Sequence, residues 1–233
     1  MNWDNAAVYD KWPVAISNRA AKEELGRQIA EKVQDGQVIG VGSGSTAYLA
    51  VHSIAERVRR ENLRISVICT SPELTLACAA VGLPVASLLQ RRPDWAFDGA
   101  DEVDPARNLI KGRGGAMFME KVLMHSSPRN FILVDPSKLV KKLGEKFPIP
   151  VEVLPIALRL VEFELKAIGA VEIVMRLAVG KDGPVITENG NLILDVRFAE
   201  IHETLEREIK AVPGVIESGL FWGRDVEIVV AGN

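Results

Sequence analysis

The apolar residues of the first 135 positions follow two alternating periods. Leu25, Ile29 and Val33 recur every four residues, which predicts a helix over 20–33. The short apolar run at 37–42 predicts a buried strand. The other elements predicted here are helices at 46–60, 72–81 and 116–125 and strands at 63–69, 84–88, 95–98 and 131–134. Strands that alternate with helices predict a mostly parallel sheet covered on both faces.

The pattern changes after the segment 147–150, which reads Phe-Pro-Ile-Pro. From here the predicted elements are strands at 151–154, 171–178, 185–196 and 215–220 and helices at 156–168 and 199–211. The turn at 189–191 interrupts the third of these strands. The resulting order, β-α-β-β-α-β, is the ferredoxin-like plan. The last apolar run, 226–230, is expected to return to the first sheet.

Together these elements predict an α/β protein with two domains. A mostly parallel Rossmann-like sheet domain comprises 1–146 and 220–233, and a smaller ferredoxin-like α+β domain, 147–219, is inserted near the C-terminus. Residues 1–15 contain Trp3, Tyr9 and Trp12 without clear periodicity. We expect them to form a tail, or an arm that packs on a neighbouring surface.

Composition narrows the classes of function. The chain has 48% apolar and 25% charged side chains, as ordinary soluble globular proteins do. Its net charge of -3 argues against nucleic acid as a partner. It has no apolar run long enough to span a membrane and no signal-peptide pattern at its start. Cys69 and Cys78 match no zinc or redox motif. We therefore expect a cytoplasmic protein with no nucleic-acid or membrane partner.

A glycine-rich segment, 40–46, lies between a predicted strand and a predicted helix. Glycines allow the backbone to approach a ligand closely, and the start of a helix offers free N–H groups, which suits a phosphate. The alternative is a tight loop whose Ser or Thr only caps the helix. The segment lacks the lysine of a P-loop, and Ser45 stands where a dinucleotide fingerprint needs its third glycine.

Carboxylates and a lysine gather between 98 and 111. Asp98 follows an apolar strand, and the acids Asp101, Glu102 and Asp104 come shortly after it. Lys111 lies a little further downstream. Buried carboxylates are unfavourable, so this concentration is expected to act on a small polar substrate. A metal site at Asp98 and Asp101 is one alternative, although Lys111 would compete with the cation. A solvated acidic turn is the other.

A second glycine-rich turn, 112–115, precedes the predicted helix that carries Glu120. The flanks of Glu120 are apolar on nearly every side, which suits a general base that works near neutral pH. The alternative is an ordinary glutamate paired with its neighbours on a wet surface. Polar clusters also follow the other predicted strands, at 43–46, 70–71 and 135–138. In parallel sheets ligands bind at this edge, so these loops predict one site.

Several segments of the chain follow one another in the order found in a known family. They are Gly-Val-Gly-Ser-Gly-Ser-Thr-Ala (40–47), Asp-Gly-Ala-Asp-Glu-Val-Asp (98–104), Leu-Ile-Lys-Gly (109–112), Glu-Lys (120–121), Val-Asp-Pro-Ser-Lys-Leu (134–139), Phe-Pro-Ile-Pro-Val-Glu-Val (147–153) and Thr-Glu-Asn-Gly-Asn (187–191). The chain thereby resembles ribose-5-phosphate isomerase, type A, from about residue 20 to the C-terminus. The resemblance implies interconversion of D-ribose 5-phosphate and D-ribulose 5-phosphate without metal or organic cofactor. It also implies a homodimer or homotetramer.

The resemblance implies a role for each matching residue. Glu120 is the general base, Lys111 stabilises the oxyanion, and Asp98 and Asp101 bind hydroxyls and assist ring opening and proton movement. The implied substrate contacts are Ser43, Gly44, Ser45, Thr46, Asp98, Gly99, Ala100, Asp101, Lys111, Gly112, Arg113, Gly114, Lys138 and Lys22.

The chain departs from the family pattern at Ser43, Arg113 and Met119, where threonine, glycine and arginine are usual. The alternatives to an isomerase are a sugar-phosphate deaminase or transferase of the same fold, and a non-enzymatic sugar-phosphate sensor.

Overall fold

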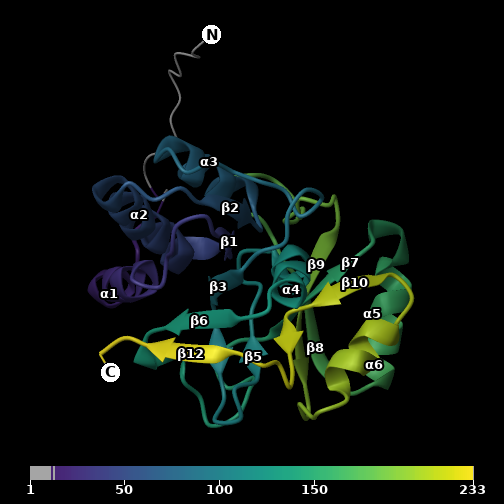
Figure 1. Cartoon of the computed structure of the whole chain (residues 1–233). Helices are drawn as coiled ribbons and strands as arrows, with labels where there is room; N and C mark the ends of the chain where they lie inside the picture. Colours follow the sequence, from purple (N-terminus) through teal and green to yellow (C-terminus); the bar gives the residue numbers. More distant parts are fainter. Residues whose placement is uncertain (1–11, 13, 233) are drawn as a thin grey trace. The chain divides into compact units, whose positions relative to one another are not determined.

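The computed structural model describes residue 12 and residues 14–232, which form two compact units. Unit 1 comprises Met1–Gly99, Val122–Pro136 and Glu227–Asn233, and unit 2 comprises Ala100–Lys121 and Ser137–Val226 (Figure 1). The predicted domain boundaries at 147 and 219 stay a prediction. Most of the predicted N-terminal arm, 1–11 and 13, lies outside the described residues.

Unit 1 is built on a five-stranded sheet in which all neighbouring strands are parallel. Its order is β12-β6-β3-β1-β2. The strands are β1 (Val38–Val41), β2 (Ser66–Cys69), β3 (Trp95–Gly99), β6 (Asn130–Val134) and β12 (Glu227–Val230). The parallel sheet is confirmed, and so is the return of the last strand, because β12 pairs with β6.

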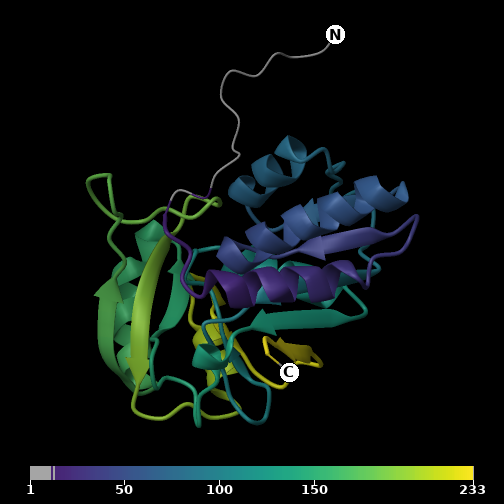
Figure 2. The same ribbon diagram turned by 90° about the vertical axis from the view of Figure 1, so that its left-hand side faces the viewer.

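Three helices of unit 1 share one hydrophobic core with the sheet. They are α1 (Arg19–Ala30), α2 (Gly44–Glu61) and α3 (Pro72–Ala80), and Figure 2 shows α1 and α2 side by side. Ile39 and Val41 of β1 belong to this core, whereas Val38 packs with Leu123 of α4 (Met117–Ser126). A Cβ on Gly40 would lie 3.1 Å from Leu123 and 2.6 Å from Ala96. Glycine at position 40 therefore lets α4 approach β1.

Unit 2 contains the predicted β-α-β-β-α-β order. Its antiparallel sheet has the order β10-β7-β9-β8. The elements are β7 (Ile149–Val153), α5 (Leu158–Ala167), β8 (Ala170–Met175), β9 (Leu192–Phe198), α6 (Leu205–Ala211) and β10 (Val215–Ser218). Val151, Val153 and Leu194 form a core with apolar residues of both helices. Short 3₁₀ turns, η1 (Pro136–Lys138) and η2 (Pro155–Ala157), complete the elements around β7.

A second sheet of unit 2 was not predicted. It consists of β4 (Glu102–Val103), β5 (Leu109–Ile110) and β11 (Leu220–Phe221), with β5 in the centre. Strands of two residues are too short to show a period in the sequence. The predicted strand 215–220 is in fact divided at Gly219, whose N–H donates to Pro150 O and whose carbonyl accepts from Lys111 N.

Three predicted elements are wrong or too long. The segment 84–88 makes only a single bridge, between Val85 and Val67. Pro84 supplies a carbonyl to this bridge but has no N–H to extend it. Residues 185–191 contain isolated bridges rather than a strand, and 199–204 are not helical. Among the helices built from described residues, none is long and apolar enough to cross a membrane.

Candidate active site

The glycine-rich loop between β1 and α2 belongs to unit 1. Gly42 N donates to Phe97 O at 2.8 Å, which ties the loop to the end of β3. Gly44 has φ +80, a value that L side chains rarely adopt. Ser43 occupies the N-cap position of α2, but its side chain makes no capping hydrogen bond. The alternative role of this hydroxyl as a helix cap is therefore not realised.

Asp98 lies at the end of β3 and is buried, with 8% of its surface exposed. Its Oδ1 accepts the backbone N–H groups of Ser43, at 3.1 Å, and Gly99, at 2.7 Å. A Cβ on Gly42 would stand only 2.0 Å from Asp98 Cγ, so glycine is required at that position. Asp98 is therefore a fixed group at the glycine-rich loop, and the alternative of a solvated acidic turn is wrong for it.

Lys22 of α1 reaches the same loop. It is buried, and its Nζ donates to Ser45 Oγ at 3.1 Å and to Ser17 Oγ at 3.4 Å. Thr46 lies close to Gly99, whose Cβ position would be 3.8 Å from the threonine hydroxyl. A lysine charge, side-chain hydroxyls and the start of a long helix thus meet in unit 1, a combination that favours an anion such as phosphate.

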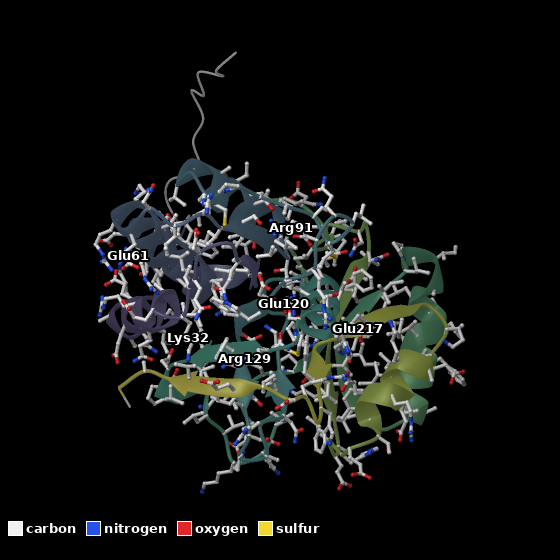
Figure 3. All side chains as sticks on the ribbon, viewed as in Figure 1. Lys32, Glu61, Arg91, Glu120, Arg129 and Glu217 are labelled. Atoms are coloured by element: carbon white, nitrogen blue, oxygen red, sulfur yellow. The ribbon has the colours of Figure 1, made fainter. Side chains whose placement is uncertain are left out.

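The central feature of unit 2 is a buried ion pair. Lys111 Nζ lies 3.2 Å from Glu120 Oε2, and each side chain is only 3% exposed. Lys111 directly follows β5, and Glu120 lies in the first turn of α4, where Figure 3 labels it. The Lys111 ammonium also lies 5.7 Å from the centre of the Phe221 ring. The alternative of a wet-surface glutamate is therefore wrong for Glu120.

Asp101 faces the same charged groups. Its Oδ2 accepts the backbone N–H of Arg113 at 3.1 Å, and its own N–H donates to Ile110 O. Burial raises the pKa of Asp101 above its usual value, although Lys111, the Arg113 N–H and Lys138 act in the opposite direction. The charge of Glu120 adds to the increase. A carboxyl group with a raised pKa suits the transfer of protons to and from hydroxyl oxygens.

The second glycine-rich turn connects Lys111 to α4. Gly112 and Gly115 have φ +95 and +92, and a Cβ on Gly112 would clash with Met117 at 2.9 Å. Glycine is thus needed for the turn as well as for the packing of α4. The two central residues of the turn, Arg113 and Gly114, are exposed, and Ala100 is half-buried.

Lys138 of η1 is also half-buried. Its Nζ lies 5.1 Å from the centre of the Phe147 ring, and its charge acts on Asp101. Unit 2 therefore brings together five of the predicted residues, namely Asp101, Lys111, Arg113, Glu120 and Lys138.

Two further charged groups of unit 2, Glu102 and Lys121, have structural roles. Glu102 is fully buried and accepts the backbone N–H groups of Gly144, Lys146 and Phe147 at 2.5–2.7 Å. It thereby fixes the segment that leads into β7.

Lys121, the residue after Glu120, is a buried centre that the sequence did not indicate. Its Nζ donates to Glu206 and Glu217 at 2.8 and 2.9 Å and also to the carbonyls of Ser218 and Leu220 (Figure 3 labels Glu217). Burial opposes ionisation of Glu206, but Lys121 and its other donors hold its pKa below the usual value. Lys121 thus anchors the N-terminal half of α4 in unit 2.

Metal ligands are a further question for these side chains. Among residues 12 and 14–232, no group of three His, Cys, Asp or Glu side chains is arranged to hold a metal ion. Cys69 and Cys78 are free thiols. The alternative of a metal site at Asp98 and Asp101 thus gains no support from the arrangement of side chains.

The fold and these buried charges define an α/β protein with the groups needed for acid–base chemistry. Comparison with known proteins identifies the family. Residues 66–233 match the family model "Ribose 5-phosphate isomerase A (phosphoriboisomerase A)". The ribose-5-phosphate isomerase A of Methanocaldococcus jannaschii is 45% identical over 217 residues, which cover 92% of this chain and 95% of the relative. That of Methanothermobacter thermautotrophicus is 41% identical over 214 residues, which cover 91% and 93%.

Solved structures agree with the sequence relatives. The structure of the Methanocaldococcus jannaschii protein matches with a TM-score of 0.88 and 44% identity, covering 92% of this chain and 96% of that one. A D-ribose-5-phosphate isomerase in complex with phospho-erythronic acid matches with a TM-score of 0.87 and 39% identity, covering 93% and 96%. The chain belongs to the ribose 5-phosphate isomerase A family, as its motifs indicated.

Proposed function

We propose that this protein interconverts D-ribose 5-phosphate and D-ribulose 5-phosphate through a cis-enediolate. The observation that carries the proposal is the buried pair of Lys111 and Glu120, 3.2 Å apart, in a chain of this family. The relative that binds phospho-erythronic acid, a phosphorylated sugar acid, also supports a sugar-phosphate substrate.

Glu120 is the proposed base. Its carboxylate takes the proton from C2 of the open-chain aldose and returns it to C1, which gives the ketose. The negative charge that develops on the carbonyl oxygen needs a fixed positive group, and Lys111 supplies it from the adjacent position. Both side chains are almost completely buried, so water does not weaken this electrostatic stabilisation.

Asp98 and Asp101 are the proposed groups for the hydroxyls. Asp98 is held by two backbone N–H groups, so its remaining acceptor capacity has a fixed direction, as hydroxyl binding requires. Asp101, with its raised pKa, is suited to move protons between O1 and O2 and to assist ring opening. The backbone of Gly99, Ala100, Gly112 and Gly114 and the side chain of Arg113 complete the proposed substrate contacts.

The proposed phosphate contacts are the loop at the start of α2 and two lysines. Ser43, Ser45 and Thr46 supply hydroxyls and Gly44 supplies backbone at the helix N-terminus. Lys22 supports this role because its ammonium already donates to Ser45 Oγ. Lys138 is the second proposed cation.

The proposal also covers cofactors, oligomeric state, cellular location and partners. We expect no metal or organic cofactor, a homodimer or homotetramer, and a cytoplasmic location without nucleic-acid or membrane partners. The acidic net charge supports the part of the proposal that concerns nucleic acid.

The test is a coupled assay with ribose 5-phosphate for the wild type, Glu120→Gln and the control Glu203→Gln, which changes an exposed glutamate. Because one base makes both proton transfers, Glu120→Gln is expected to lose turnover by about 10²- to 10⁴-fold or more. Its melting curve should still show a folded protein, and EDTA should leave the wild type active. An inactive wild type, or near-normal turnover by Glu120→Gln, contradicts the proposal.

A further inference from the structure

Arg176 makes an unusual set of contacts within unit 2. It directly follows β8, and its side chain is 16% exposed. Nη1 donates to the carbonyl oxygens of both Gly112 and Arg113 at 2.9 Å. Nε donates to Asp195 Oδ2 on β9 at 2.9 Å, and Nη2 binds Asp195 Oδ1. One side chain therefore connects the sheet β10-β7-β9-β8 to two successive carbonyls of the glycine-rich turn.

Only arginine can make this connection. The planar guanidinium has five donors in a fixed arrangement, so it can bind a carboxylate on one side and carbonyls on another. A lysine ammonium at the same place is a single point with three donors and cannot reach both sides with this geometry. The arrangement is also partly shielded from water, since Asp195 is 22% exposed. The interaction of Arg176 with Asp195 therefore contributes more to stability than an ordinary surface ion pair does.

The turn that Arg176 binds carries two groups of the proposed mechanism. Lys111 is the residue immediately before Gly112, and the N–H of Arg113 donates to Asp101 Oδ2 at 3.1 Å. The carbonyls held by Arg176 and the N–H held by Asp101 thus belong to the same short stretch of backbone. A shift of this stretch would move the Asp101 hydrogen bond and the Lys111 backbone together.

Packing alone does not hold the turn on this side. Asp101, Arg113, Arg176 and Asp195, with Phe147, Pro148 and Pro150, line a cavity of about 290 Å³. Arg113 and Gly114 are exposed. On the side of this cavity, the carbonyls of Gly112 and Arg113 are held by the hydrogen bonds from Arg176.

We propose that Arg176 is a positioning residue for the isomerase reaction. It fixes the carbonyls of Gly112 and Arg113, so that Lys111 and the N–H that binds Asp101 stay in place. Asp195 keeps the guanidinium in its orientation. This inference rests on the proposed function, because it acts through the roles given there to Lys111 and Asp101.

The pH dependence of the rate provides a specific readout. Lys111, the backbone N–H of Arg113, Lys138 and Glu120 act on Asp101, and the charged side chains of Arg113, Arg176 and Asp195 line the same cavity. The N–H stabilises the ionised carboxylate, so loosening the turn removes a contribution that lowers the pKa of Asp101. The acid limb of the kcat/KM profile is then expected to move to higher pH. Arg176→Lys keeps a cation beside this cavity, so a shifted acid limb in that variant reports the position of the turn and not the loss of a charge.

The experiment compares the wild type with Arg176→Ala, Arg176→Lys and a matched control. Glu172 of β8 and Arg197 of β9 form another ion pair, with a separation of 3.5 Å. Among the described residues, Glu172 makes no hydrogen bond or ion pair with the glycine-rich turn. Glu172→Gln therefore perturbs the same two strands and should keep wild-type kcat and pH profile. A misplacement of catalytic groups by about 1 Å can reduce a rate about 100-fold, so Arg176→Ala should lose about 10- to 100-fold in kcat.

The remaining measurements decide the inference. Millimolar guanidinium ion should restore part of the kcat of Arg176→Ala, and Arg176→Lys should remain slow. If Arg176→Ala does not fold, kcat and the acid limb are compared between the wild type, Asp195→Asn and Arg176→Lys. Unchanged kcat and an unchanged acid limb in the folded variants overturn the role of Arg176. The wild-type rate in the same assay separately tests the proposed function, so the two failures are distinguishable.

Discussion

The buried pair of Lys111 and Glu120 allows stability and catalysis to be separated. We consider Lys111→Met, Glu120→Gln and the double variant. At the observed separation of 3.2 Å, two unit charges attract by about 5 kcal/mol with an effective dielectric constant of about 20. Removing one partner of a buried pair typically costs about 3–5 kcal/mol, because the other charge then remains in a poorly solvated site.

These magnitudes predict how the stability and the rate should differ among the variants. Lys111→Met should lose about 3–5 kcal/mol of the free energy of unfolding, since it takes the cation away from the buried carboxylate of Glu120. The double variant should recover part of that loss, because a neutral amide replaces the carboxylate. Catalysis should not recover, because the base and the oxyanion partner are both gone.

The assay is denaturant unfolding of the four proteins, combined with the coupled rate measurement. The two single variants and the double variant form a double-mutant cycle, which isolates the interaction between the side chains. Equal unfolding midpoints for the wild type and Lys111→Met, or a coupling energy near zero, refute this reasoning. So would a double variant that regains turnover together with stability.

Two more predictions concern the carboxylates. Gly42→Ala places a Cβ 2.0 Å from Asp98 Cγ, so the aspartate must move and kcat/KM should fall at least about tenfold. Gly180→Ala meets no atom within 4 Å, although its φ of +86 strains the backbone, so it should lose some stability but retain the wild-type rate. Burial raises the pKa of Asp101, so the folded state binds its proton more tightly and stability declines as pH rises through that pKa. Asp101→Asn should therefore raise the melting temperature near pH 7 but not below about pH 3.9, and an equal effect at both contradicts this.

The sequence predicted the elements that carry strong local patterns. Leu25, Ile29 and the other apolar positions of α1 recur at a helical spacing and are buried, so burial and pattern agree. The β-α-β-β-α-β order of unit 2 was also predictable, because each strand and helix is long enough to show its period. Asp98 could be placed at the end of β3 because an apolar run leads directly into it.

Other features depend on tertiary contacts that leave no local pattern. The strands β4, β5 and β11 have two residues each, and β11 lies about 110 residues from its partner β5. Lys121 and Arg176 look like ordinary surface cations in the sequence, yet both are enclosed by partners remote in the chain. The Cβ clashes at Gly42 and Gly112 likewise become visible only when Asp98 and Met117 are placed beside them.

The central claim is that Glu120 moves a proton between C2 and C1 of the sugar phosphate. The most direct measurement follows ribose 5-phosphate by NMR while the wild type interconverts it in D₂O over many turnovers. A carboxylate that holds the C2 proton exchanges it with solvent in a fraction of the turnovers, so deuterium should accumulate at C2 of the aldose and C1 of the ketose over many turnovers, and Glu120→Gln should abolish both this exchange and the interconversion. Interconversion or deuterium uptake by Glu120→Gln at the wild-type rate would contradict the account.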